Sequence, residues 1–527
     1  MNVYSIDYFL LFFKSLGKYF ETGEAAENLT NYTKNCIISI CFGNRTEYGG
    51  SVMETYSAVN FADVSVWRSV LLITILLLSL LAANILKTKI PLFKRSLIPN
   101  SVLGGMILLI ISSVCYYTTG DYLFNLKVFS ENSSGISTLE GLTYHCLAIG
   151  FIAMTLRPVQ KKLKGNRTTE ILNSGCMTIG TYVIQAILGI TITVIASLVI
   201  QGFSPSCGVL LCFGYGQGTG QALNIGKNFD IGMGTSGYSS FGLTIAALGF
   251  LTASIAGVLA LNIFRKNGKL KFREGKAAEE IFSAENEPPV NESVDKLSIQ
   301  LALVALAYLL AYGMMYLLGN VIIRTGNFVG TIYGFNFLFG VLAAVLVKKI
   351  LDILKKTGLL KRNYPNSFLL NRISGFAFDI MIVAGICAIQ IHLIQDYIGV
   401  ILLLGVAGAV SSWFYVKFVC ERIFPAYAYE QFLAFFGMLT GTASTGMILL
   451  READPGLESP VSENLVYQNF PAIILALPLL FIANYLTTNA ASRTSALIML
   501  GVLILVFIIL NLFIFRSRLH RKAGGKA

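Results

Sequence analysis

The chain has 527 residues, of which 55% are hydrophobic and only 13% are charged. A soluble globular domain carries about a quarter charged residues, so this composition excludes an ordinary soluble protein. The net charge of +12 does not indicate a nucleic-acid partner, because the Lys and Arg residues lie in short segments beside long apolar runs, where they orient helices in a membrane. We therefore expect an all-α polytopic membrane protein, since helices satisfy their own backbone groups in a bilayer.

Residues 1–64 form a polar N-terminal extension that we expect outside the cytoplasm. The apolar patch that begins at Tyr8 is short and is interrupted by Lys14, so an interfacial helix is an alternative to a membrane span there. Cys36 and Cys41 would form a local disulfide if this extension faces an oxidising compartment. The nine cysteines do not predict a zinc site, because no CxxC pair occurs among them.

Long apolar runs follow, and about 20 helical residues are needed to cross the bilayer core. In the first half the runs predict a broken segment at 206–225 and spans at 66–86, 98–117, 142–156, 173–200 and 241–264. A charged linker at 265–296 precedes the second half. There the runs predict a broken segment at 429–450 and spans at 297–318, 328–347, 372–391, 397–420 and 465–486. An additional span at 495–515, within a C-terminal segment 488–527 that ends in a basic tail, closes the chain.

The basic residues predict how the chain crosses the membrane. Clusters of Lys and Arg follow alternate spans, beginning with Lys87 and ending with Lys522, and the positive-inside rule places these clusters in the cytoplasm. The linker and the C-terminus are then cytoplasmic, and the N-terminal extension lies outside the plasma (cell inner) membrane. With the spans oriented in this way, segment 206–225 enters and leaves from outside, whereas segment 429–450 enters and leaves from the cytoplasm. Both segments are predicted to be re-entrant.

The two broken segments match each other in sequence. Phe213–Thr219 aligns without a gap with Phe436–Thr442, and the Phe-Gly pair that opens each segment and the Gly-Thr pair that closes it are identical. Because the segments occupy corresponding places in oppositely oriented halves, they predict two inverted-topology repeats, 65–264 and 297–487. Broken helices at membrane depth are tolerated where they line a cavity, in which helix N-termini suit an anion and oxygen ligands suit Na⁺. Close helix packing on small residues is the alternative.

The residues at both breaks resemble motifs of the sodium/glutamate symporter family. The Gly-rich motif of that family's first half is similar to Gly216–Gly220, and its second-half motif is similar to Gly437–Gly441 with Thr445. The family's second and third helices open with motifs that resemble Ile98–Asn100 with Gly104 and Gly105, and Ile149–Met154. The resemblance covers residues 66–490. Gln217 replaces the His of the family, and the second motif has fewer glycines, so the substrate stays open.

The resemblance implies a homodimeric, elevator-type carrier that couples inward Na⁺ flow to uptake of glutamate or a related small amino acid bearing a carboxylate. Together with the chemistry of the breaks, it gives an expected substrate site of Gly216, Gln217, Gly218, Thr219, Gly220, Gly437, Gly441, Thr442, Thr445 and Arg451. The expected ion-coupling residues are Thr219, Asn224, Thr442, Asp379 and His145. Beyond the coupling ion and membrane lipid, no cofactor and no nucleic acid is expected.

Few ionisable residues lie inside the predicted spans. Asp379 is one, and an intramembrane acid is costly enough to suggest a cation or proton site, although a hydrogen bond that serves packing is the alternative. His145 suits a gate or a proton relay, or lies at the interface. Gln217, Gln221 and Asn224 project from the first broken segment toward an ion or a substrate. Arg451 would pair with a substrate carboxylate, or anchor the cytoplasmic side.

Two other classes of function stay open. An ion channel also uses Gly-rich re-entrant loops, but two inverted, non-identical loops in one chain favour alternating access. Gly234–Gly237 matches the GxSG motif of rhomboid intramembrane serine proteases, whose Ser needs a neighbouring His such as His145. A four-residue match is weak evidence. The sequence contains no HExxH, Walker A or kinase motif, so an enzyme is not predicted.

Overall fold

The computed structural model describes residues 61–91, 97–158, 166–270, 293–323, 326–359 and 364–524. Within these ranges the secondary structure is helical and contains no strand. Ten helices in the described part of the chain are long and apolar enough to span a membrane, as an all-α multi-pass membrane protein requires. Residues 1–60, with Tyr8 and the pair Cys36 and Cys41, lie outside the described residues, as does the linker segment 271–292.

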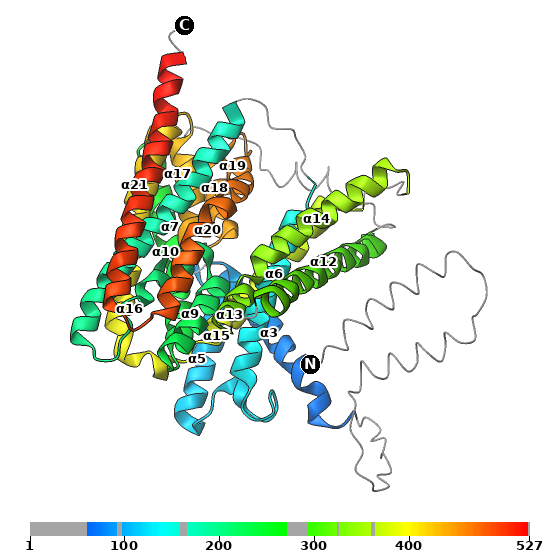
Figure 1. Ribbon diagram of the computed structural model, residues 1–527. Coiled ribbons are helices and arrows are strands. Elements are labelled where there is room, and N and C mark those ends of the chain that lie inside the picture. Colours follow the sequence, from blue (N-terminus) through cyan, green and yellow to red (C-terminus); the bar gives the residue numbers. More distant parts are fainter. Residues whose placement is uncertain are drawn as a thin grey trace. The chain divides into compact units, whose positions relative to one another are not determined.

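The ten long helices correspond to predicted spans, with ends that differ by several residues. In chain order they are α3 (Val64–Lys89), α5 (Asn100–Thr119), α6 (Gly135–Leu156), α7 (Asn166–Val199), α10 (Tyr238–Lys266), α12 (Ser293–Tyr316), α15 (Ser367–Cys387), α16 (Ile398–Ile423), α20 (Asn469–Thr488) and α21 (Arg493–Gly524) (Figure 1). Local chemistry sets some of their ends. The Asp63 carboxylate accepts a hydrogen bond from the Ser65 N–H at 3.0 Å and caps α3, and Gly120 ends α5 at φ 84°.

Both predicted broken segments are helices with an interruption. In the first, α8 (Leu210–Gln217) and α9 (Thr219–Met233) meet at Gly218, whose φ of 79° and ψ of −169° are open only to glycine. In the second, α17 (Ala428–Thr440) and α18 (Ala443–Ala453) are separated by Gly441 and Thr442. The interruptions fall at the aligned Gly-Thr pairs, so the sequence predicted their positions correctly.

The structure divides the predicted span at 328–347 into two helices, and this region is absent from the ten candidate spans. One residue, Phe335, separates α13 (Gly326–Gly334) from α14 (Asn336–Lys356). The Asn336 amide donates to the Tyr144 carbonyl at 2.9 Å, and the Tyr144 hydroxyl donates to the Tyr333 carbonyl at 2.6 Å. These bonds to α6 stabilise the interruption, which hydropathy alone does not reveal. A short helix, α19 (Val461–Tyr467), likewise precedes α20 where one span was expected.

Helices of the two halves pack against each other in reciprocal pairs. α6 packs on α15, and α7 packs on α16. α5 contacts α15, and its counterpart in the second half, α14, contacts α6. Likewise α9 contacts α20, and its counterpart α18 contacts α10. The halves are therefore interleaved in space, with residues of each completing the surroundings of the other.

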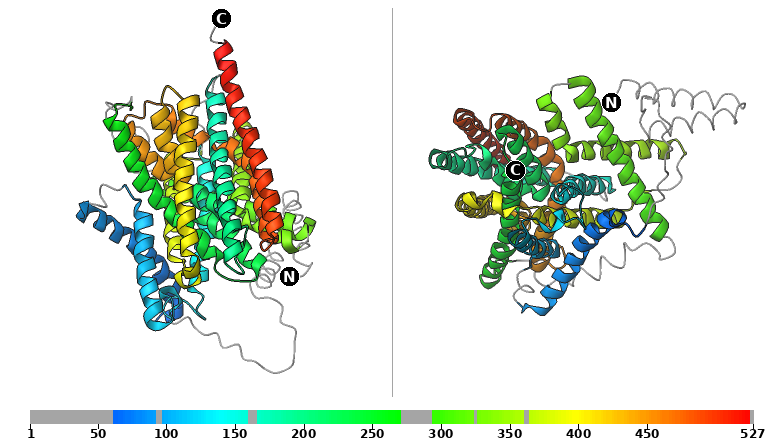
Figure 2. Two further views of the ribbon diagram at one scale, coloured as in Figure 1. Left: turned by 90° about the vertical axis from the view of Figure 1, so that its left-hand side faces the viewer. Right: turned by 90° about the horizontal axis from the view of Figure 1, so that it is seen from below.

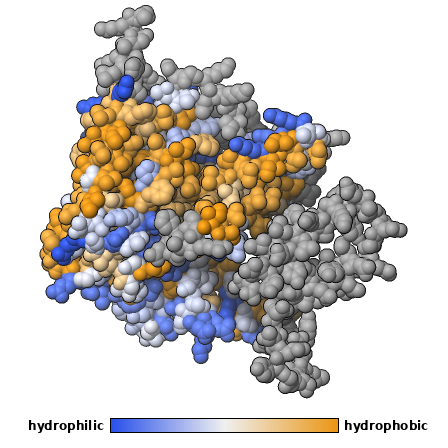
Figure 3. Space-filling view, viewed as in Figure 1, coloured by the Kyte–Doolittle hydropathy of each residue, from blue (hydrophilic) through white to orange (hydrophobic). Residues whose placement is uncertain are grey.

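Large apolar side chains cover the outer faces of the helices. Figure 2 shows α21, α7, α16 and α10 running side by side, and direct packing of α7 on α21 and α16 accompanies this arrangement. In Figure 3 hydrophobic residues form a broad continuous area over α21 and its neighbours, with hydrophilic residues gathered below it. Leu505, Ile509 and Leu512 of α21 are more than half exposed. Such a surface suits lipid and would be unfavourable in water.

Candidate functional site

The two helix interruptions line one cavity of about 170 Å³. Its walls come from α5, α6, α7, α8 and α9 in the first half and from α14, α15, α17, α18 and α20 in the second. Apolar side chains such as Leu147, Phe151 and Met438 make up much of the lining. Pockets for drug-sized ligands measure roughly 300–1,000 Å³, so this smaller cavity suits a small metabolite.

The first interruption presents Gly216, Gln217 and Gln221 to the cavity. Gln221 is 1% exposed, and neither its side-chain oxygen nor its side-chain nitrogen has a hydrogen-bond partner. Thr178 of α7, also 1% exposed, leaves its hydroxyl unpartnered on the same cavity. Because buried polar groups in native proteins are nearly always paired, these groups are available to a bound molecule or to water in the cavity.

The second interruption presents Gly441, Thr442 and Ser444. Thr442 caps α18, since its Oγ1 accepts from the Thr445 N–H at 3.2 Å and lies 3.1 Å from the Thr445 hydroxyl. The first N–H groups of a helix have no partner within the helix and carry partial positive charge. This end of α18 can therefore interact with an anionic group in the cavity.

The described lining of the cavity has one charged side chain, and it belongs to α15. Asp379 of α15 and Ser101 of α5 both line the cavity, and the Asp379 side chain is exposed rather than buried. Among the described residues that line the cavity, no other Asp or Glu and no Lys, Arg or His occurs. The cavity thus combines one carboxylate with hydroxyl, amide and backbone groups, which can bind a cationic group and an anionic group at different places.

Three expected residues at the first interruption lie next to the cavity wall without lining it. Gly218 has the backbone conformation, described above, that only glycine adopts. A Cβ added to it would contact only Phe250, at 3.7 Å. Thr219 is fully buried, and its hydroxyl donates to the carbonyl of Met381 at 3.3 Å. A Cβ on Gly220 would come within 2.8 Å of Leu147, so this glycine allows α9 to approach α6.

At the second interruption, too, some of the expected residues line the cavity and others only pack helices together. A Cβ on Gly437 would come within 2.9 Å of the Gly446 backbone, so Gly437 allows α17 and α18 to pack closely. Thr445 is buried and serves the Thr442 cap. Gly441 both lines the cavity and packs against Ala253 of α10. Close helix packing therefore explains some of the glycines that the sequence links to a ligand.

Three further expected residues lie away from the cavity lining. The Asn224 amide donates to the Gly334 carbonyl at 3.1 Å and joins α9 to α13. The His145 Nδ1 bonds the Tyr308 hydroxyl of α12. Arg451 is exposed in the last turn of α18. No hydrogen bond among the described residues joins His145 to Ser236, which is exposed between α9 and α10.

Sequence reasoning missed several polar residues of the cavity. Thr178 and Tyr182 of α7, Asn469 at the start of α20, and Ser101 and Ser444 all line it. The Tyr182 hydroxyl donates to the Gly216 carbonyl at 2.9 Å, which secures the end of α8. Thr178 and Tyr182 are one helical turn apart, so they lie on the same face of α7. This spacing of two polar residues is the signal by which the sequence could have indicated them.

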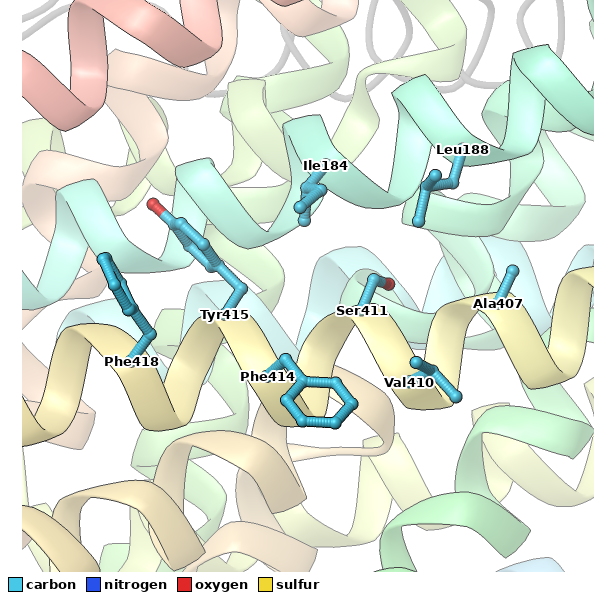
Figure 4. A pocket seen from close by; sticks show the side chains of 8 residues that line it. All are labelled: Ile184, Leu188, Ala407, Val410, Ser411, Phe414, Tyr415 and Phe418. Carbon is cyan, nitrogen blue, oxygen red and sulfur yellow. The ribbon is translucent and has the colours of Figure 1, made fainter.

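A second hollow, of about 390 Å³, lies on the outer surface between α7 and α16 (Figure 4). Figure 4 shows Ile184 and Leu188 on α7 facing a row of side chains on α16. Its two hydroxyl groups are already bonded, Ser411 to the Gly408 carbonyl and Tyr415 to Asn511. Since both of its hydroxyl groups have partners, the cavity lined by the two interruptions, called the inner cavity below, is the better candidate site.

The described residues contain no group of three or more His, Cys, Asp or Glu side chains that could hold a metal ion by those ligands. An alkali cation bound by carbonyl and hydroxyl oxygens needs no such group. No protein-family model matches the chain, and no curated protein matches it.

Proposed function

We propose that this protein is a Na⁺-coupled secondary transporter that carries a small amino acid bearing a carboxylate through the inner cavity. The observation that carries the proposal is Gln221, a fully buried amide without a protein partner on the wall of a cavity of metabolite size. The resemblance of the Gly216–Gly220 and Gly437–Gly441 segments to sodium/glutamate symporters favours this class. The protein would act as a homodimer in the plasma membrane of the cell, with its C-terminus in the cytoplasm.

An arrangement of inverted repeats is part of this proposal. It is supported by the reciprocal packing of α5 and α14, and of α9 and α18, on helices of the opposite half. It is also supported by two carboxylates at corresponding places. Asp230 accepts hydrogen bonds from the N–H groups that begin α10, and Asp454 accepts hydrogen bonds from the Glu458 and Ser459 N–H groups ahead of α19. Inverted repeats around a central site are the common basis of alternating access.

Coupling to Na⁺ would use oxygen atoms near the two interruptions. Thr219 lies against the carbonyl of Met381, and Met381 itself lines the cavity. Thr442 and Thr445 place two hydroxyl oxygens 3.1 Å apart. Hydroxyl and carbonyl oxygens are suitable ligands for a hard cation. In an elevator mechanism, a core that includes both interruptions would move against a scaffold and expose the cavity to each side in turn.

The test is transport by the purified protein in liposomes. Labelled amino acids and dicarboxylic acids are supplied outside, with an inward Na⁺ gradient or with equal Na⁺ on both sides. We expect saturable uptake of at least one amino acid that the gradient increases. Gln221→Leu should reduce this uptake at least tenfold, whereas Gln395→Leu, at an exposed site between α15 and α16, should not.

Two results would contradict the proposal. A steady single-channel current in a planar bilayer, without saturable uptake, would instead indicate a channel. Uptake that ignores the Na⁺ gradient but follows a pH gradient would keep the carrier and replace its coupling ion.

A further inference from the structure

Asp379 is the charged residue of the cavity, and its carboxylate restricts what the cavity can bind. Two cations on adjacent helices are paired elsewhere. Lys227 forms an ion pair with Glu140 at 2.8 Å. Arg157 donates to the Met154 carbonyl at 3.0 Å and to the Asn371 side chain at 3.1 Å. Neither cation lines the cavity.

A substrate with two carboxylates and one ammonium, such as glutamate, carries a net negative charge. With Asp379 and one coupling Na⁺, bound glutamate would leave the cavity with a net charge of −1. No Lys, Arg or His among the described lining residues would offset that charge. A charge without a partner in a cavity whose lining is mostly apolar is unfavourable, and two negative charges close together there repel each other.

A zwitterion without a second carboxylate avoids this cost. Its ammonium group would pair with Asp379. Its single carboxylate would accept hydrogen bonds from the unpartnered Gln221 amide and from the free N–H groups at the start of α18, beside Thr442 and Ser444. The apolar walls, which include Leu147 and Phe378, would enclose an uncharged side chain.

We infer that the cavity selects zwitterionic α-amino acids with uncharged side chains over acidic amino acids, with Asp379 binding the substrate ammonium and Gln221 binding the carboxylate. This inference rests on the proposed transport function and narrows its substrate class. It departs from the glutamate specificity that the sequence resemblance implies.

The experiment measures binding by thermal stabilisation of the purified full-length protein in detergent with Na⁺ present. The probes are L-leucine, L-glutamine, L-glutamate and 4-methylpentanoate, which is leucine without its amine. We expect leucine or glutamine to bind at least tenfold more tightly than glutamate, and 4-methylpentanoate to give no stabilisation. This comparison uses the unmodified protein and does not depend on the folding of any variant.

Asp379→Asn then tests the role of the carboxylate. It should weaken the binding of the preferred amino acid at least tenfold, while stabilisation by Na⁺ alone is retained. Asp379→Glu should restore part of the affinity, because it keeps the charge. The matched control is Asp396→Asn, at an exposed carboxylate between α15 and α16, which should leave binding unchanged.

The outcomes separate this inference from the proposed function. Tighter binding of glutamate than of glutamine would overturn the inference and leave a carrier of acidic amino acids. Loss of the Na⁺ response in Asp379→Asn, with amino-acid affinity unchanged, would overturn it in favour of Asp379 as a Na⁺ ligand. If no amino acid binds or is transported, the proposed function fails and the inference fails with it.

Discussion

The hydroxyl of Tyr182 donates a hydrogen bond to the carbonyl of Gly216 at 2.9 Å, and both residues line the inner cavity. This carbonyl belongs to the last turn of α8, where the helix has no N–H groups left to offer. The aromatic ring packs where a Cβ on Gly216 would otherwise lie. Tyr182 therefore gives the Gly216 carbonyl a hydrogen-bond partner and holds the backbone in position at the first interruption.

The first prediction concerns this bond. Tyr182→Phe removes the hydroxyl and keeps the ring, so it should lower stability by about 1 kcal/mol, the net value of one buried hydrogen bond. It should also weaken substrate binding, because the end of α8 is no longer secured. Thermal unfolding and uptake measure the two effects. Tyr485→Phe, on an exposed face of α20, is the control and should change neither.

The second prediction separates backbone conformation from packing. Gly218→Ala should destabilise the protein by about 1–3 kcal/mol, because the φ and ψ of Gly218 suit only glycine. Gly501→Ala, inside α21 with open space around it, should be neutral or stabilising by roughly 0.5–1 kcal/mol, because glycine weakens a helix interior. Equal melting temperatures for the two variants would show that the interruption tolerates a side chain.

The third prediction tests the orientation of the two interruptions. Single cysteines at Ser236 and Glu458, introduced after removal of the native cysteines, should react with a membrane-impermeant reagent from opposite sides of the membrane. Both positions are exposed. Asn464, which the charge pattern also places on the cytoplasmic side, is unsuitable because it is fully buried and donates to Gln431. Labelling of both cysteines from one side would rule out inverted repeats.

The fourth prediction is a pH dependence at a contact between two loops. The Tyr122 hydroxyl bonds the Nδ1 of His392, and Tyr116 stacks on both rings. Burial raises the pKa of Tyr122 to about 12, so its hydroxyl stays protonated near neutral pH. Burial also lowers the pKa of His392 below its ordinary value of 6.5.

Because the folded state favours neutral His392, its contribution to stability is complete above pH 6.5 and is lost as the pH falls through the lowered pKa. The melting temperature should therefore fall between about pH 6.5 and pH 5. His392→Phe keeps a ring to stack on Tyr116 and removes the titrating group, so its melting temperature should depend less on pH in that interval. An unchanged pH dependence would assign the effect to other groups.

Much of the fold follows from local sequence properties. Long apolar runs predicted the ten helices of the described residues that are long and apolar enough to span a membrane. The Gly-Thr pairs at Gly218 and Gly441 predicted both interruptions, because glycine and helix caps act within a few residues. The interruption at Phe335 was missed because it depends on bonds between Asn336 and Tyr144, which lie in different halves of the chain.

The candidate site was predicted less completely for the same reason. Gln217, Thr442 and Asp379 could be found by their place in a motif or by a charge within an apolar run. The significance of Gln221 and Thr178 lies in what surrounds them: both are buried, both face one cavity, and neither has a partner. Burial and missing partners are properties of the packed chain, and no local pattern of residues determines them.

The single carboxylate of Asp379 on the cavity wall also has an electrical consequence for transport. In an elevator mechanism the empty cavity would move with one unpaired negative charge, whereas a cavity that holds a zwitterion and one Na⁺ would be neutral. The free energy of an elementary charge changes by about 2.3 kcal/mol for each 100 mV of membrane potential that it crosses. The membrane potential would therefore act on the return of the empty carrier and leave the inward step of the loaded one almost unaffected, so an inside-negative potential would accelerate turnover by resetting the protein.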